Sequence, residues 1–558
     1  MQAVLHRSFL PAAIALALFG CGDKSTPATP ATDSTTTSSY DGTVPADAVL
    51  AETQTMVIGN SAEPESLDPH KTSGVPESNI IRQMLIGLTT TDNDGKTIPG
   101  MATEWHTDDN KVWTFKIRDA NWSNGDPVTA HDFVYSFRRL VDPATASPYS
   151  TYLADLTMLN AQDIVDGKQS PDTLGVKAID DKTLEITLAE PVPYLPDALM
   201  HTSVKPVNQK AVAQFGDKWT SPENYVANGP YNLKEWQINE KIVLTRNPTY
   251  YDDANTTINE VTLLAVGESS TEVNRYKAGE MDITSGVPEE QFQQLKTELG
   301  TQVSVQPKLC TYYYEFNNTK PPFNDPRVRR ALTLAMDRET VAEKILGQGQ
   351  TAAYQLNPTF IQGMNNYTPE WQSWSKEQRI AEAKRLLAEA GYNASNPLSF
   401  ELLYNTSDSH KKIASAAVSF WKDGLEFIDA KLVNQEWKTY LETKRKQDFE
   451  IARAGWCADY NEPSSFLNIF KSGNSQNAGK YNSPTYDAIM LKTLGADIDA
   501  NGRAELYHQA EAELEKDNPA IFVYHYVGPK LIKPYVAGFS DKDPQDNWQV
   551  KYYKVLAH

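Results

Sequence analysis

Two stretches in the first third of the chain alternate apolar and polar residues with a period of two. The apolar positions are Trp113, Phe115 and Ile117 in the segment 112–117 and Leu184, Ile186 and Leu188 further along. Successive side chains of a β-strand point to opposite faces of its sheet. The alternation therefore predicts two half-buried strands.

Other stretches have the spacing and the end signals of helices. Asp325 followed by Pro326 suits an N-cap and a first helical position. Apolar residues then recur three or four positions apart, at Val328, Ala331, Leu332 and Ala335. Ser375 with Gln378 matches a capping box, and Gly391 marks the end of the helix that follows. Strand and helix signals alternate along the chain, which predicts a mixed α/β fold.

Length and charge narrow the class of protein. The chain has 558 residues, a formal net charge of −20 and a sequence pI of about 5.0. It is too long for a single hydrophobic core, so several domains are expected. The acidic balance argues against a nucleic-acid partner, because binding to phosphates requires a basic surface.

The N-terminus has the pattern of an export signal. Residues 1–20 place Arg7 before an apolar stretch, and Cys21 follows in the position of a lipoprotein processing site. We therefore predict a signal peptide over 1–20 and a lipid anchor on Cys21; a secretory signal cut elsewhere is the alternative. Residues 21–51 are rich in Ser, Thr, Pro and Ala, which predicts a flexible tether.

The chain has three cysteines, Cys21, Cys310 and Cys457. If Cys21 carries lipid, an even pair remains, and an exported compartment favours its oxidation. We predict a Cys310–Cys457 disulfide, with two unpaired buried thiols as the alternative.

A search for catalytic and metal-binding motifs finds none. The sequence contains no His-Glu-x-x-His, no paired CxxC, no G-x-S-x-G and no P-loop. Gly347-Gln-Gly349 resembles half of a dinucleotide fingerprint but follows a helix pattern, so we interpret it as a turn at a helix end. We expect no enzymatic activity, no cofactor and no metal.

Many segments in order along the chain resemble a single family. They are Ser66-Leu-Asp-Pro-His70, Gly74-Val-Pro-Glu-Ser-Asn79, Lys111-Val-Trp-Thr-Phe115, Trp122-Ser-Asn-Gly125, Pro127-Val-Thr-Ala-His-Asp-Phe-Val-Tyr135, Cys310-Thr-Tyr-Tyr-Tyr-Glu315, Lys320-Pro-Pro-Phe-Asn-Asp325 and Ala452-Arg-Ala-Gly-Trp-Cys-Ala-Asp-Tyr-Asn-Glu-Pro463. Together they resemble the periplasmic oligopeptide-binding proteins of ABC importers, in solute-binding protein family 5 (the peptide/nickel type). The resemblance runs from about Thr53 to the C-terminus.

The resemblance implies the α/β periplasmic-binding-protein fold of class II (cluster C). In this fold two lobes close like a hinge over the ligand, and an extra domain sits on the first lobe. The implied ranges are 52–85, 208–309 and 527–558 for lobe one, 86–207 for the extra domain and 310–526 for lobe two, with hinges near Cys310 and Tyr526.

The function implied by the resemblance is capture of short oligopeptides and their delivery to the membrane permease subunits of an ABC importer. The protein would be a monomer in the periplasm, held to a membrane through lipid on Cys21. A murein (cell-wall) peptide receptor on the same fold is the alternative. A secreted peptidase and a chaperone-like holdase are rivals from other classes.

The resemblance also implies a peptide-binding site. Asp459 would bind the α-ammonium of the peptide, and Arg453, Lys444 and His410 would receive its carboxylate at different depths. Ser73, Gly74 and Val75 would lend backbone groups, as would Gly455, Trp456 and Cys457, so that the peptide adds as a strand. Aromatic walls would come from Tyr149, Tyr313, Trp437, Trp456 and Tyr526.

Structural roles remain the alternative for each of these residues. Asp459 would then cap a helix or a loop, Arg453 would neutralise buried acids, Lys444 and His410 would be surface residues, and the aromatic residues would belong to the core.

Two positions depart from the family pattern. Ser73 stands where relatives often have a glutamate that faces basic side chains of the ligand, and Lys444 stands where an arginine is common. Lysine is a point charge rather than a bidentate fork, so it recognises a carboxylate less strictly. Our hypothesis is a weaker preference for lysine-rich peptides.

Overall fold

The computed structural model describes residues 48–558. The predicted signal peptide (1–20) and the predicted lipid anchor at Cys21 lie outside the described residues, as does the predicted tether (21–51) up to residue 47. In the last part of that range, the Ala51 N–H donates to the Val555 carbonyl at 2.9 Å, and Leu50 bridges Leu556. Backbone hydrogen bonds thus already hold this part of the predicted tether.

The first lobe is built on a four-stranded sheet, here called sheet I. Its order is β1 (Thr55–Gly59), β10 (Glu260–Leu264), β9 (Lys241–Arg246) and β8 (Tyr231–Gln237). The β1–β10 pair is parallel and the other pairs are antiparallel. The helices of this lobe are α1 (Val75–Met84), α7 (Ser269–Ala278) and α8 (Glu289–Leu299).

An antiparallel sheet, here called sheet III, forms the extra domain. Its order is β4 (Ala102–His106), β5 (Val112–Ile117), β7 (Thr183–Thr187) and β6 (Val176–Asp180). Both predicted strands are present, and the six apolar residues of the two patterns are at most 5% exposed. The chain here also forms β2 (Thr89–Thr91), β3 (Thr97–Pro99), α2 (Ala130–Val141), α3 (Tyr152–Asp155), α4 (Ala161–Val165) and α5 (Leu195–Ala198), and α6 (Gln209–Phe215) follows where the chain returns to the first lobe.

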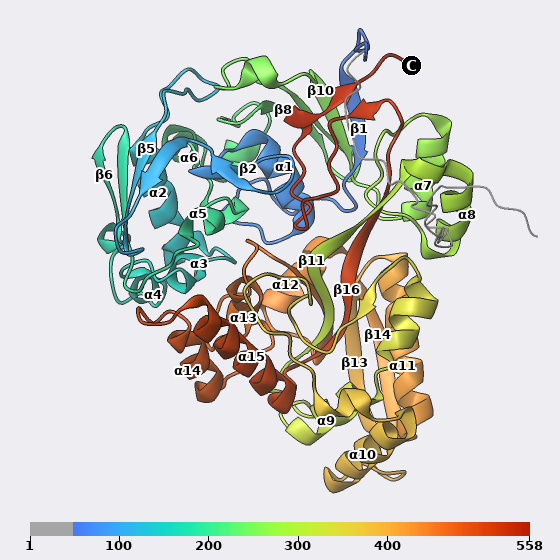
Figure 1. The fold of residues 1–558 in the computed structure, drawn as a ribbon. Helices are drawn as coiled ribbons and strands as arrows, with labels where there is room; N and C mark the ends of the chain where they lie inside the picture. The colour runs from blue at the N-terminus through green and yellow to red at the C-terminus, as the bar shows by residue number, and fades with distance from the viewer. Residues whose placement is uncertain (1–47) are drawn as a thin grey trace, which may run out of the picture. The chain divides into compact units, whose positions relative to one another are not determined.

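The second lobe is built on a mixed six-stranded sheet, here called sheet II. Its order is β12 (Thr351–Ala352), β16 (Ala520–Leu531), β11 (Val303–Phe316), β15 (Ile451–Cys457), β13 (Leu398–Asn405) and β14 (Ile428–Gln435). The long strands β11 and β16 lie side by side (Figure 1), and their pairing is interrupted between Pro307 and Thr311. The end of β16 reaches sheet I, because Ile532 bridges Ile283, which in turn bridges Ile58. These two strands therefore connect the lobes.

The helices of the second lobe begin and end where the sequence signals predict. Asp325 caps α9 by accepting from the Arg327 N–H, and the capping box of Ser375 and Gln378 is formed. Gly391 (φ +92°) and Gly347 (φ +63°) adopt left-handed conformations that a residue with a side chain rarely adopts. The helices are α9 (Pro326–Ala335), α10 (Lys376–Glu389), α11 (Asp408–Leu425), α12 (Trp437–Arg445), α13 (Ser464–Leu467), α14 (Pro484–Lys492) and α15 (Ala500–Asp517), and the chain closes with the pair β17 (Val536–Ala537) and β18 (Lys554–Val555).

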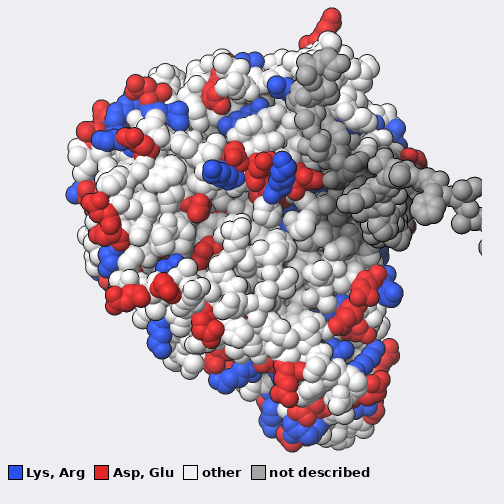
Figure 2. All heavy atoms as spheres, viewed as in Figure 1, with Lys and Arg blue, Asp and Glu red and all other residues white. Residues whose placement is uncertain are grey.

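Positive and negative side chains are mixed on one face of the molecule. On the face shown in Figure 2, Lys and Arg side chains lie among Asp and Glu side chains. Within residues 48–558, no helix combines the length and the apolar character needed to cross a membrane.

Candidate peptide-binding cavity

A cavity of about 460 Å³ lies between the two lobes. Sites for small ligands usually measure about 300–1,000 Å³, so the cavity has room for a short peptide or a similar molecule. All fourteen residues predicted for the peptide site line it: Ser73, Gly74, Val75, Tyr149, Tyr313, His410, Trp437, Lys444, Arg453, Gly455, Trp456, Cys457, Asp459 and Tyr526. The fold thus brings the predicted residues together in one cavity, although they lie far apart in the sequence.

Asp459 is a buried carboxylate whose side-chain contacts in the described chain are with neutral groups. Its side chain is 9% exposed, and its Oδ1 accepts from the Tyr149 hydroxyl at 3.1 Å and lies 3.3 Å from His201 Nε2. Burial, followed by repulsion from Lys205 and Arg82, lowers the pKa of His201 to about 3, so its ring is neutral. Burial also raises the pKa of Asp459 well above its usual range, although the Tyr149 hydrogen bond opposes this. The arrangement is suited to receive a cation.

Strand β15 presents to the cavity a backbone edge without a second strand partner in the described chain, although the Arg453 carbonyl accepts from the Tyr440 hydroxyl. It pairs with β11 from Ile451 to Cys457, but on its other side β13 pairs only with Ile451 and Ala452. Residues 453–457 line the cavity and have no second strand partner in the described chain. Unpaired N–H and C=O groups on a strand edge are a template for an added strand.

Gly74 forms part of the facing wall at the start of α1. A Cβ atom here would lie 2.0 Å from Glu77 Oε2 and 2.9 Å from Trp437 Cζ2. Glycine is therefore required for Trp437 of the second lobe to approach α1, where its indole donates to Glu77 Oε1 at 3.2 Å.

The three predicted cations near the other end of the edge differ in charge and pairing. Arg453 donates to the Tyr526 hydroxyl at 2.7 Å and to Asn405 Oδ1 at 3.4 Å, with no described carboxylate oxygen within 4.0 Å. Lys444 is already paired with Glu315, at 2.8 Å. Burial and the charge of Arg453 lower the pKa of His410 well below its usual value, so its ring is neutral. Arg453 is thus the one residue of these three with a charge free for a ligand.

The remaining predicted residues shape the walls. Cys310 and Cys457 are joined by a disulfide that ties β15 to β11 next to Asp459. Tyr149 packs against Trp456, with ring centroids 6.2 Å apart. Tyr313 is 4% exposed and also packs against Phe470 and Phe522, so it belongs to the core as well as to the cavity wall.

Several lining residues were not predicted from the sequence. They include Arg82, His201, Lys205, Lys308 and Asn405. Each comes from a segment whose pattern indicates only a helix, strand or loop, and no motif marks them.

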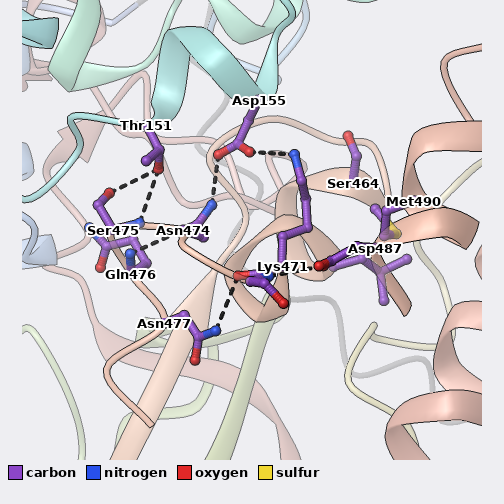
Figure 3. A network of polar contacts seen from close by, with 12 residues as sticks. Thr151, Asp155, Ser464, Lys471, Asn474, Ser475, Gln476, Asn477, Asp487 and Met490 are labelled. Atoms are coloured by element: carbon purple, nitrogen blue, oxygen red, sulfur yellow. Dashed lines mark hydrogen bonds and ion pairs between the residues drawn. The ribbon is translucent and has the colours of Figure 1, made fainter. Parts of the chain in front are cut away.

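The extra domain and the second lobe bond to each other beside the cavity (Figure 3). Lys471 pairs with Asp155 Oδ1 at 2.8 Å, and Asn474 donates to Asp155 Oδ2 at 2.7 Å. The Ser475 N–H donates to Thr151 Oγ1 at 3.1 Å. We call these five residues the latch; together with the Trp437–Glu77 bond they hold the lobes closed over the cavity.

The described residues offer no evident metal site. Within residues 48–558, no three His, Cys, Asp or Glu side chains come together in a way that could hold an ion.

Comparison with known proteins places these features in a family. Residues 96–478 match the model of the bacterial extracellular solute-binding proteins, family 5. The chain is 52% identical to the periplasmic oligopeptide-binding protein OppA of Salmonella typhimurium over 92% of its own length and 95% of the relative's. It also resembles the crystal structure of Haemophilus influenzae OppA in complex with RPPGFSPFR (TM-score 0.89, 50% identity, 91% of this chain and 100% of the other).

Two structures of the murein tripeptide-binding protein MppA allow a further comparison. The TM-score is 0.90 to one structure of Escherichia coli MppA, at 41% identity over 91% of this chain and 100% of the other. It is 0.65 to an MppA structure described as the unliganded open form, at 41% identity over 92% and 99%. The closed arrangement of the lobes thus differs from that open form. In sequence, fold and closed cavity alike, the chain belongs to the family 5 bacterial extracellular solute-binding proteins.

Proposed function

We propose that this protein captures short peptides in the closed cavity and delivers them to the permease subunits of an ABC importer. One observation carries the proposal: the cavity holds a carboxylate, Asp459, and a guanidinium, Arg453, that have no oppositely charged partner among residues 48–558; Arg453 lies on the β15 edge and Asp459 lies two residues beyond its end. A peptide carries an ammonium group, a carboxylate and a hydrogen-bonding backbone, which complement these three features.

The spacing suits a short peptide. Four residue steps separate Arg453 from Cys457 on β15, which is about 13 Å at the usual rise of a strand, and Asp459 lies two residues further. An extended peptide of a few residues bridges such a distance between its charged ends. Its backbone would pair with residues 453–457, and water around its side chains would allow different sequences to bind.

Delivery requires that the importer distinguish loaded from empty protein. We propose that residues 52–85, 208–309 and 527–558 move as one lobe carrying the extra domain 86–207, and that 310–526 move as the other. The hinge would lie near Cys310 and Tyr526 in the two connecting strands. A bound peptide bridging the lobes would shift the equilibrium towards the closed, latched form.

The relatives support a location and a class. OppA is named as periplasmic, and the family consists of extracellular solute-binding proteins. We propose that this chain acts in the periplasm as a monomer without enzymatic activity, anchored to a membrane through lipid on Cys21.

Native mass spectrometry of the purified protein, followed by denaturation and sequencing of released molecules, tests the proposal. A mixed set of short peptides is the expected result. Release of one murein-type peptide, with competition by L-Ala-γ-D-Glu-diaminopimelate, would instead favour a cell-wall peptide receptor. An empty protein that gains no thermal stability from added peptides would overturn the assignment.

A further inference from the structure

A second group of charged side chains lines the cavity. Arg82 on α1, Lys205 after α5 and Lys308 on β11 all line the cavity, and Lys530 on β16 lies behind them. These four cations come from segments far apart in the sequence, so only the fold brings them together.

The carboxylates near this group match only part of its positive charge. Asp546 pairs with both Lys308 (2.8 Å) and Lys530 (2.5 Å). Asp543 accepts the backbone N–H groups of Gln545 and Asn547, at 2.9 and 2.8 Å. Of the four basic side chains, Lys308 and Lys530 are thus the two in direct contact with a carboxylate in the described chain.

Lys205 is the unmatched charge of the group, whereas Arg82 has no carboxylate in direct contact but is attracted by Asp543 and Asp546 at longer range. In residues 48–558 no carboxylate oxygen lies within 4.0 Å of either side chain's nitrogens. Arg82 donates to Asn79 Oδ1 at 3.0 Å, whereas the Lys205 ammonium has no hydrogen bond in the described chain although the residue is only 3% exposed. Burial and the nearby Arg82 accordingly lower the pKa of Lys205 to about 7. A buried cation without a partner is costly, and an anionic ligand would remove that cost.

Two contacts place this group at the Asp459 end of the cavity. His201, four residues before Lys205, lies 3.3 Å from Asp459 Oδ1. Gln545, next to Asp546, donates to the Ala458 carbonyl at 3.0 Å. The group therefore flanks the position of the first residue of a peptide whose α-ammonium meets Asp459.

We propose that Lys205 and Arg82 form an anion-binding subsite for the side chain of the first residue, so that the protein prefers peptides beginning with Asp or Glu. The inference rests on the proposed function. An N-terminal Glu presents an ammonium to Asp459 and a carboxylate to Lys205 within one residue. A neutral first residue leaves Lys205 unpaired, and an N-terminal Lys brings a third positive charge to the subsite.

Calorimetric titration of the full chain, stripped of bound peptides, with Glu-Ala-Ala and Gln-Ala-Ala tests the subsite, because the two peptides differ by one charge at nearly the same shape. We expect Glu-Ala-Ala to bind about tenfold more tightly, as for one charge-assisted hydrogen bond, and Lys-Ala-Ala to bind most weakly. The Glu/Gln ratio should fall to about one in Lys205→Met and in Lys205→Gln, and persist in Lys205→Arg. Lys218→Met, which removes an exposed lysine without an ion pair in the described chain, is the matched control.

The outcomes separate the two proposals. Failure of all these peptides to bind would overturn the proposed function. Equal binding of Glu-Ala-Ala and Gln-Ala-Ala, or an unchanged ratio in both Lys205→Met and Lys205→Gln, would overturn the subsite alone. A preference for Ala-Glu-Ala over Glu-Ala-Ala would overturn its assignment to the first residue. Thermal unfolding checks that the variants are folded; both neutral variants should melt no lower than the parent, because each removes an unpaired buried charge.

Discussion

The two ends of the β15 edge are built in different ways. At Asp459 a single carboxylate is buried and its side chain contacts neutral groups, the Tyr149 hydroxyl and the neutral His201 ring; within residues 48–558 no Lys or Arg nitrogen lies within 4.0 Å of it. Near Arg453, three basic residues gather, but Glu315 already occupies Lys444 and His410 is neutral. The Asp459 end thus offers one fixed site for an ammonium group. The other end offers the free charge of Arg453 for a carboxylate, together with Lys444, which is already paired, and His410, which is neutral.

This difference between the two ends matches the chemistry of peptides of different length, in which the position of the α-ammonium is constant and that of the carboxylate varies. The α-ammonium always lies at the start of the backbone, so one position suffices for it. The carboxylate moves along the edge by about 3.3 Å with each added residue. We therefore expect substitutions at the Asp459 end to affect all peptides, and those at the Arg453 end to depend on peptide length.

Asp459→Asn should produce the largest effect. Removing one partner of a buried charge pair usually costs about 2–5 kcal/mol, so the affinity for tri-alanine should fall by about 100-fold or more. The empty protein should melt at a higher temperature, because an uncompensated buried carboxylate is gone. Isothermal titration and calorimetric melting measure both changes. A loss of less than tenfold would mean that Asp459 does not bind the ammonium.

The affinity should also depend on pH through the same carboxylate. Burial raises the pKa of Asp459 in the empty cavity, and a bound ammonium lowers it again, so binding favours the ionised form. Affinity should be full above the raised pKa and fall by up to about tenfold per pH unit as the pH drops through it. Titrations of tri-alanine from pH 8 to pH 4 check this. The affinity of Asp459→Asn should change little with pH. If its affinity falls with pH as steeply as that of the parent protein, another titrating group causes the effect.

Arg453→Met should weaken binding by about tenfold, the worth of one hydrogen bond to a charged group. The loss should vary among tri-, tetra- and penta-alanine, because only some of them place the carboxylate at Arg453. Titrating the three lengths into this variant and into Arg275→Met, which changes an exposed arginine of α7, gives the comparison. Equal losses for all lengths would contradict an adjustable carboxylate end.

Lys444→Met should change the affinity for tri-alanine by less than about fivefold, since the charge of Lys444 is already matched by Glu315. Stability should fall more clearly, by about 3–5 kcal/mol, because Glu315 stays buried without its partner. The double variant Lys444→Met/Glu315→Gln should recover most of the melting temperature. Thermal unfolding of the single and double variants measures this. A strong loss of affinity with unchanged stability would mean that Lys444 binds the peptide rather than stabilising Glu315.

The smallest effect concerns Ser73. Tri-lysine and tri-alanine should bind within about fivefold of each other, because Ser73 offers no charge to a basic side chain. Ser73→Glu should shift the preference towards tri-lysine, with Ser73→Gln as the uncharged control. A strong preference for tri-lysine in the parent protein would refute the hypothesis drawn from this position.

Local elements of the fold were predictable because their signals lie within a few residues. The alternation over 112–117 and the Asp325-Pro326 pair each specify a strand or a helix start without reference to the rest of the chain, and both are present. The order of strands in sheet II is different in kind. In that sheet β11 pairs with β15 and β16, which lie more than a hundred residues further along the chain. The local alternation of apolar and polar residues does not indicate which distant strand pairs with which.

The same limit applies to the cavity. Resemblance to a family identified residues that lie there, such as Asp459 and Arg453, although it could not show that Glu315 occupies Lys444. It also missed Lys205 and Arg82, since a lysine in a loop and an arginine on a helix look like ordinary surface residues. Their burial results from packing among segments more than a hundred residues apart.

The disulfide between Cys310 and Cys457 has a practical consequence. It engages both cysteines of the described chain, so a protein carrying Cys21→Ser would contain no free thiol. A single cysteine introduced at Ser475, beside Thr151, would then be the sole attachment point for an environment-sensitive fluorophore. Each opening and closing of the lobes would change the emission of that dye, and the protein would become an optical sensor for peptides in solution.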